Sequence, residues 1–117
     1  MEMSREMDFA LLELTPIGRV ESPLTDRASA PKQGHEEAPD AWLVFEPAVV
    51  DGLQGIRVGD RVIVLTWLDR ARRDRPNPIG LHEVEVVAID GQRVLVHNLE
   101  ALNGTPILDV KPVLRRG

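Results

Sequence analysis

The sequence predicts an all-β protein, a small antiparallel β-barrel or sandwich of about six strands with short helical turns. Two observations carry this prediction. Short apolar runs of strand length recur along the 117 residues, and glycine, proline and Asx-Gly turn signals separate them. We expect one domain over residues 1–117, with a loose N-terminus over 1–12, because a chain of this length supports one core.

The first half of the chain predicts two strands with a long loop between them. Leu14 to Ser22 (LTPIGRVES) has the pattern of a short strand that starts near Pro16. Pro23 to Asp40 is rich in proline and charge, so we expect a long surface loop. The apolar run AWLVFEP then has strand length and ends at Pro47, and a brief helix can follow over Ala48 to Leu53.

The second half predicts a central strand, a hairpin and a final short strand. RVIVLTWL (Arg61 to Leu68) is the most β-branched run and predicts the central strand. The alternating runs IGLHEVEVVAI and QRVLVHNL flank Asp90-Gly91, so we expect a tight hairpin with both of these residues at positive φ. Asn103-Gly104 predicts one more turn before the last strand, which lies in PILDVKPVL.

Composition excludes several classes of protein. Zero cysteine removes disulfides and thiolate chemistry, and no glycine loop has the spacing of a nucleotide-binding fingerprint, so the fold is non-Rossmann. A net charge of -5 argues against broad capture of nucleic acid, although the local cluster DRARRDR (Asp69 to Arg75) is either a contact site or a solvated, self-paired loop. The first ten residues do not resemble a secretory signal, so we expect a cytoplasmic protein without a membrane span.

The histidines and aromatic residues suggest structural roles on their own. The three histidines are far apart in sequence and have no paired-ligand spacing, so we expect no metal site. His82 alternates in phase with Val84 and Val86, and we expect it to titrate near the ordinary histidine pKa. Phe45 and Trp67 sit in apolar strand runs, so we expect both in the core.

The stretch RPNPIGL, which begins at Arg75, is unusually stiff for a segment that leads into a strand. Pro76 and Pro78 each restrict the residue before them, so Arg75 and Asn77 are pushed toward extended conformations. Gly80 permits a close approach where the strand begins. Groups that are set in place beforehand lower the ordering cost of ligand binding. A rigid edge loop without a ligand is the equally weighted alternative.

Two stretches resemble a known family. RPNPIGL, followed further on by LEALNGTPILDVKP, resembles the TsaA/TrmO (YaeB-like) family, and PIGRVESP and PKQGHE resemble its early signature. The resemblance covers roughly residues 14–114. It implies a small β-barrel that binds S-adenosyl-L-methionine, commonly across a homodimer interface. It also implies methylation of N6 of threonylcarbamoyl-adenosine at position 37 of certain tRNAs.

Site residues follow from the resemblance position by position. It implies that the cofactor is bound by Gln33, Gly34 and His35 in the early loop, by Asp69 and Arg70 after the central strand, by Leu81 after the proline motif, and by Asn98, Leu99 and Glu100 before the Asn-Gly turn. It implies that Arg75, Asn77, Asn103 and Asp109 face the substrate. For Asn103 and Asp109 a structural duty in a turn is the alternative.

The chain departs from the family pattern between the central strand and RPNPIGL. Members of the family commonly carry a longer segment there, whereas Trp67 and Arg75 are separated here by seven residues. Either the segment has been lost and Arg72 or Arg73 substitutes, or the printed sequence omits it, which we favour because DRARRD resembles the start of that segment. The chain also stops soon after KPVL, so we expect no additional C-terminal domain, and this weakens the tRNA expectation more than the methyl-donor one.

Two functions from different classes remain. One is a methyltransferase that uses S-adenosyl-L-methionine, with tRNA as its acceptor. The other is a non-catalytic barrel that binds the cofactor or a protein partner, which a genuine loss of the arginine segment would favour. An oligonucleotide-binding barrel without a cofactor is disfavoured, because the sequence offers few aromatic residues for stacking.

Overall fold

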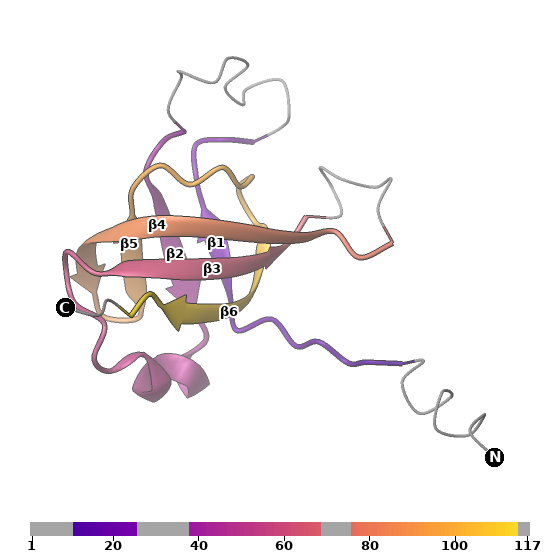
Figure 1. Cartoon of the computed structure of the whole chain (residues 1–117), viewed down its shortest axis with the longest axis horizontal. Helices are drawn as coiled ribbons and strands as arrows, with labels where there is room; N and C mark the ends of the chain where they lie inside the picture. The colour runs from indigo at the N-terminus through magenta and orange to yellow at the C-terminus, as the bar shows by residue number, and fades with distance from the viewer. Residues whose placement is uncertain (1–10, 26–37, 69–75, 115–117) are drawn as a thin grey trace.

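The computed structural model describes residues 11–25, 38–68 and 76–114 of the chain. Within them, antiparallel strands close into a barrel in the spatial order β1-β2-β5-β4-β3-β6, because β6 pairs with both β3 and β1 (Figure 1). The predicted all-β fold is therefore confirmed. The strands are β1 (Gly18–Glu21), β2 (Ala41–Phe45), β3 (Arg61–Trp67), β4 (Ile79–Asp90), β5 (Arg93–Val96) and β6 (Pro106–Pro112), and a 3-10 helix η2 (Pro47–Leu53) follows β2.

Strand alternation places the core inside the barrel. On β3, Val62, Val64 and Thr66 point inward and are at most 1% exposed, while the residues between them are only half-buried. On β4, Val84 and Val86 take the inward positions, as the alternation in the sequence predicts. Neighbouring strands supply the rest of one continuous apolar cluster.

The two aromatic residues expected in the core have different environments. Phe45 is 1% exposed and belongs to the core cluster, which confirms the expectation. The expectation for Trp67 is wrong, because its neighbour Thr66 points inward and successive strand residues face opposite sides. The indole of Trp67 is therefore half-buried on the outside of the barrel.

The β4–β5 hairpin is confirmed, but its turn lies one residue later than the Asp-Gly signal implies. Asp90 pairs with Arg93, so the two central residues are Gly91 and Gln92. Gly91 has a φ of 61°, whereas neither Asp90 nor Gln92 has a positive φ. A glycine with positive φ at the first central position is what a type II′ turn requires, and this differs from the expected type I′ turn.

β4 is the longest strand, and it pairs with two neighbours in turn. Its first half, Ile79 to Glu85, pairs with β3, and its second half pairs with β5 from Val86 onward, with a register shift between Val86 and Ala88. The chain leaves β5 at His97, whose N–H donates to the Glu85 carbonyl at 2.9 Å. Residues beyond His97 therefore pass close to the half of β4 that follows RPNPIGL.

Candidate functional site

Three connections meet at one end of the barrel. β1, β3 and β5 finish there and β2, β4 and β6 begin there, so residues 22–25, 38–40, 68 and 76–78 lie at this end together with the connection 97–105. Backbone hydrogen bonds join them: Leu99 N–H donates to the Pro39 carbonyl at 3.1 Å, and Asn103 N–H donates to the Leu24 carbonyl at 2.6 Å. Sequence segments that lie far apart in the chain therefore share one surface, which includes RPNPIGL and the start of NLEALNGTP.

The proline motif closes the hairpin between β3 and β4. Leu68 N–H donates to the Pro78 carbonyl at 2.6 Å, which extends the β3–β4 ladder by one further bond beyond the strands. Ile79 N–H donates to the Asn77 carbonyl at 2.8 Å, so the backbone of Asn77 is used in the turn. Pro78 is buried, whereas Asn77 is exposed. Residues 68 and 76–78 thus bring the ends of the β3–β4 hairpin together.

Gly80 is the glycine of the motif, and its role is steric. A Cβ placed on Gly80 would lie 2.6 Å from His82 Nε2, 2.6 Å from Leu68 Cδ1, and closer still to Thr66 Oγ1. Real Cβ atoms essentially never come within 3.0 Å of such neighbours. The motif therefore needs glycine here because three side chains pack directly against its backbone.

His82 lies between the two motif segments. Its Nε2 is 2.9 Å from Oγ1 of the fully buried Thr66. Burial lowers the pKa of His82 below the ordinary value of 6.5, and the nearby Glu100 carboxylate opposes this effect only in part. The expectation of an ordinary pKa for His82 is therefore wrong, because the ring sits inside the end of the barrel instead of facing water. At neutral pH the site holds a neutral imidazole beside a carboxylate.

Asn98 anchors the end of the early loop. It has a φ of 61°, in the left-handed region that asparagine tolerates better than most residues. Its Oδ1 accepts a hydrogen bond from Ala38 N–H at 2.6 Å. Beside it, Asp40 Oδ1 lies 2.7 Å from His97 Nδ1 and accepts from Asn98 N–H at 3.3 Å. This arrangement holds residues 38–40 against the segment that begins at His97.

Asn103 anchors the other side of the same loop. Its Oδ1 accepts from Ser22 N–H at 3.0 Å, and Gly104 N–H donates to the Val20 carbonyl at 2.7 Å. Asn103-Gly104 forms the predicted turn, and Gly104 has a φ of 85°. These contacts give Asn103 the structural duty that was the alternative to substrate contact.

The remaining predicted residues of the 97–105 segment differ in exposure. Leu99 is fully buried and belongs to the core cluster, so only its backbone can reach a ligand. Glu100 is exposed at the barrel end and acts on His82 electrostatically. Glu100 is thus brought into the electrostatic environment of His82, a residue to which the sequence analysis gave no role in the site. Its position immediately after the motif was the only available signal.

Leu81 and Asp109 lie elsewhere, on the outer face of the barrel. Both pair with Leu65, one from β4 and the other from β6. Leu81 is 71% exposed. The Asp109 carboxylate accepts from Val110 N–H at 2.9 Å and lies 3.2 Å from Lys111 Nζ. A single chain therefore does not bring these two residues to the side of the barrel that holds His82.

Six predicted site residues lie outside the described part of the chain. They are Gln33, Gly34 and His35 of the early loop, and Asp69, Arg70 and Arg75 of the arginine-rich connection. Their assignments stay predictions. Among residues 11–25, 38–68 and 76–114, no group of three or more histidine, aspartate or glutamate side chains is placed to hold a metal ion, and no helix is long and apolar enough to cross a membrane.

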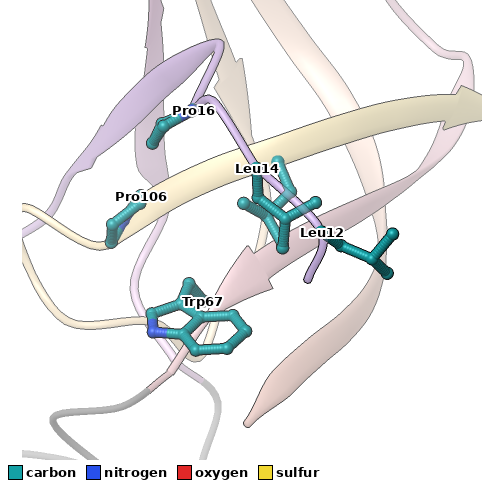
Figure 2. Close-up of a pocket in the computed structure, with 6 residues that line it drawn as sticks. Leu12, Leu14, Pro16, Trp67 and Pro106 are labelled. Atoms are coloured by element: carbon teal, nitrogen blue, oxygen red, sulfur yellow. The ribbon is translucent and has the colours of Figure 1, made fainter. Parts of the chain in front are cut away.

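An apolar pocket of about 300 Å³ lies on the outside of the barrel, and the sequence did not predict it. Figure 2 shows the indole of Trp67 at this pocket together with Leu14 and Pro106. The extended N-terminal segment forms one wall, and Ile17 N–H in that segment donates to the Ile107 carbonyl of β6 at 2.8 Å. The pocket thus lies beside the end of β3 where the arginine-rich connection begins.

Comparison with known proteins identifies the family. The model of the tRNA-methyltransferase O N-terminal domain matches residues 72–116, which include both motifs. An S-adenosyl-L-methionine-binding protein of Archaeoglobus fulgidus is 34% identical over 120 residues, and the match covers 84% of this chain and 86% of that protein. The chain belongs to the TrmO family. The crystal structure of TrmO from Pseudomonas aeruginosa superposes with a TM-score of 0.74 at 25% identity and 89% coverage of this chain.

The chain spans only part of some TrmO-family relatives. It covers 56% of the Pseudomonas aeruginosa TrmO chain. It covers 34% of a second Archaeoglobus fulgidus protein, a probable S-adenosyl-L-methionine-binding protein that is 36% identical over 124 residues. The similarity to TrmO therefore concerns the barrel, which is the part that the two motifs build.

Proposed function

We propose that this TrmO-family barrel binds S-adenosyl-L-methionine at the end where RPNPIGL and NLEALNGTP meet, and that it methylates a tRNA nucleoside. The acceptor that the family suggests is N6 of threonylcarbamoyl-adenosine at position 37. The observation that carries the proposal is the convergence of both family motifs on His82, which packs against Gly80 and lies within electrostatic range of Glu100. Relatives named for S-adenosyl-L-methionine binding support the choice of ligand.

The residues at this end suit such a ligand. S-adenosyl-L-methionine carries a positively charged sulfonium. A neutral imidazole does not repel that charge as a protonated histidine would, and a neighbouring carboxylate attracts it. Asn98, Leu99 and Glu100 would hold the cofactor on one side, with Gln33, Gly34, His35, Asp69 and Arg70 completing the proposed set within one chain. Leu81 lies on the outer face, so it would contact the cofactor of the partner in a dimer. Arg75 and Asn77 are the proposed substrate-side residues of one chain. Asn103 would act through the turn that it anchors, and Asp109, on the outer face, would reach a substrate only at the partner's site in a dimer.

In this proposal the chain acts mainly by placement. When bound, the cofactor supplies an electrophilic methyl group on a good leaving group, so the acceptor nitrogen needs alignment more than a strong base. The exposed Asn77 amide is held at a turn whose backbone is fixed by two prolines and by the Ile79 N–H. Asn98 and Asn103 hold the two ends of the early loop against the same surface.

The test is transfer of labelled methyl groups to tRNA that carries threonylcarbamoyl-adenosine, with nucleosides separated by mass spectrometry. The proposal expects a methylated form of that nucleoside, and Asn77→Ala lowers the rate at least about tenfold. The matched control is Gln54→Ala, which removes an exposed side-chain amide at the opposite end of the barrel and leaves the rate unchanged. Cofactor binding without transfer to any tRNA would favour the non-catalytic binding module instead.

A homodimer is part of the proposal, and the outer face of β3 and β4 is its proposed interface. Ile79 is 49% exposed and Leu81 is 71% exposed, and both flank Leu65 and Trp67 in the β3–β4 register. Exposed apolar patches of this kind mark interaction surfaces. Light scattering should give a dimer mass that Leu81→Glu reduces to that of a monomer. Val58→Glu, at an exposed turn position far from this face, should leave the dimer intact.

A further inference from the structure

His82 connects elements that carry separate family motifs. Its ring packs over Gly80 of RPNPIGL, its Nε2 lies 2.9 Å from Thr66 Oγ1 on β3, and Glu100 of the 97–105 segment faces it electrostatically. Its inward neighbours Val84 and Val86 are at most 3% exposed, whereas His82 is half-buried. The ring therefore lies at the rim of the barrel interior, where the proposed ligand would approach.

The surroundings of His82 keep the ring uncharged at neutral pH. Thr66 of β3 contacts it, and Gly80 and Leu68, which follows β3, pack beside it, and none of these groups carries a charge. Among the described residues, Glu100 is the charged group that acts on it. Burial outweighs this carboxylate, so the pKa of His82 stays below 6.5. At a pH above the pKa of His82, the pair therefore carries the single negative charge of Glu100. Below that pKa the protonated ring neutralises this charge.

We propose that His82 and Glu100 together make the site selective for the positively charged methyl donor over its uncharged thioether product. The inference rests on the proposed function, because it requires the cofactor to bind at this end. The Glu100 carboxylate attracts the sulfonium, and the neutral ring of His82 does not repel it. S-adenosylhomocysteine lacks the sulfonium charge and gains nothing from the carboxylate. A site with this preference favours exchange of the product for a new molecule of the methyl donor.

The same electrostatics predict that the affinity for S-adenosyl-L-methionine falls as the pH is lowered. Protonated His82 repels the sulfonium, and two unit charges several ångströms apart near a protein surface change affinity by roughly tenfold or more. S-adenosyl-L-methionine and S-adenosylhomocysteine share their adenosine, amino and carboxylate groups. Titration of those shared groups therefore cancels when the two affinities are compared as a ratio. The ratio of the two affinities therefore reports only the contribution of the sulfonium charge to binding.

The experiment is calorimetric titration of both ligands into the full chain, from neutral pH downward until the ring of His82 is protonated, which histidine-ring NMR follows in the same samples. We expect the preference for S-adenosyl-L-methionine over S-adenosylhomocysteine to fall roughly tenfold as pH drops through the pKa of His82. His82→Gln keeps a polar side chain beside Thr66 but cannot be charged, so it should give a pH-independent ratio. Glu100→Gln should lower the ratio at neutral pH without weakening S-adenosylhomocysteine binding.

The matched control is Glu85→Gln, the same substitution as in Glu100→Gln, at an exposed carboxylate on the outer face of β4. It should keep the pH-dependent ratio of the unaltered chain. A ratio that does not change with pH in the unaltered chain overturns the inference, and so does a pH-dependent ratio that persists in His82→Gln. Neither ligand binding at any pH overturns the proposed function together with this inference, whereas binding without charge selectivity overturns the inference alone. The comparison in the unaltered chain requires no variant to fold.

Discussion

Replacing Gly80 by alanine tests the packing at the centre of the site. The φ of Gly80 is not positive, so the backbone accepts alanine and any loss of stability must come from side-chain contacts. The new methyl group would lie 2.6 Å from His82 Nε2 and 2.6 Å from Leu68 Cδ1, where ordinary contacts are about 3.5–4.0 Å. Each neighbour must therefore withdraw by about 1 Å, and overpacking of this kind costs about 1–3 kcal/mol.

Urea denaturation followed by tryptophan fluorescence measures the effect. A loss of about 2 kcal/mol moves the unfolding midpoint by roughly 1 M urea for a chain of this size. Gly52→Ala is the matched control, because nothing lies within 4 Å of its new Cβ and it should leave stability unchanged or raise it slightly. In a His82→Ala background the penalty of Gly80→Ala should shrink, since one of the crowding groups is gone. Equal midpoints for Gly80→Ala and Gly52→Ala would refute the packing argument.

Three further predictions concern single residues. Asn98→Asp should keep most of the stability, because aspartate retains an acceptor for Ala38 N–H and tolerates positive φ. Asn98→Ala should lose about 2 kcal/mol of unfolding free energy in chemical denaturation, and equal losses for the two variants would contradict the anchoring role. Burial depresses the pKa of His82 below 6.5, so the unfolded chain binds a proton at a higher pH than the folded chain does. Stability should therefore fall as the pH drops below about 6.5 toward the pKa of the folded state, and thermal melts of His82→Gln should show a weaker fall. Phe45→Leu should lower the free energy of unfolding by about 1–2 kcal/mol, because the ring is fully buried in the core, and an unchanged melting temperature would argue against that packing.

Much of the fold follows from local patterns in the sequence. The runs around Val62 and Val84 alternate because one face of each strand is buried, so strand position and inward residues can be predicted together. Turn geometry is less accessible, because either residue pair of Asp90-Gly91-Gln92 can occupy the centre of a hairpin. The cross-strand pair Asp90–Arg93 decides between them, and it depends on the register of the whole hairpin.

The site is harder to predict, because it depends on contacts between distant segments. The resemblance to the family identified RPNPIGL and LEALNGTPILDVKP, but it gave no role to His82, whose environment arises from Thr66 on β3 and Glu100 after β5. The side of the barrel that Trp67 occupies is likewise fixed by the phase of β3, which an apolar run alone does not reveal. Polar turn residues such as Asn103 predicted the positions of turns correctly. The sequence alone could not decide whether such a residue holds the turn or contacts a substrate.

The location of the cofactor site is the central claim, and backbone amide NMR tests it most directly. On addition of S-adenosyl-L-methionine to the labelled chain, the largest shift changes should fall on residues 77–82 and 97–103, at one end of the barrel, while residues 51–60 at the opposite end stay unchanged. Changes concentrated around residues 51–60, or no changes at saturating cofactor, would contradict the account.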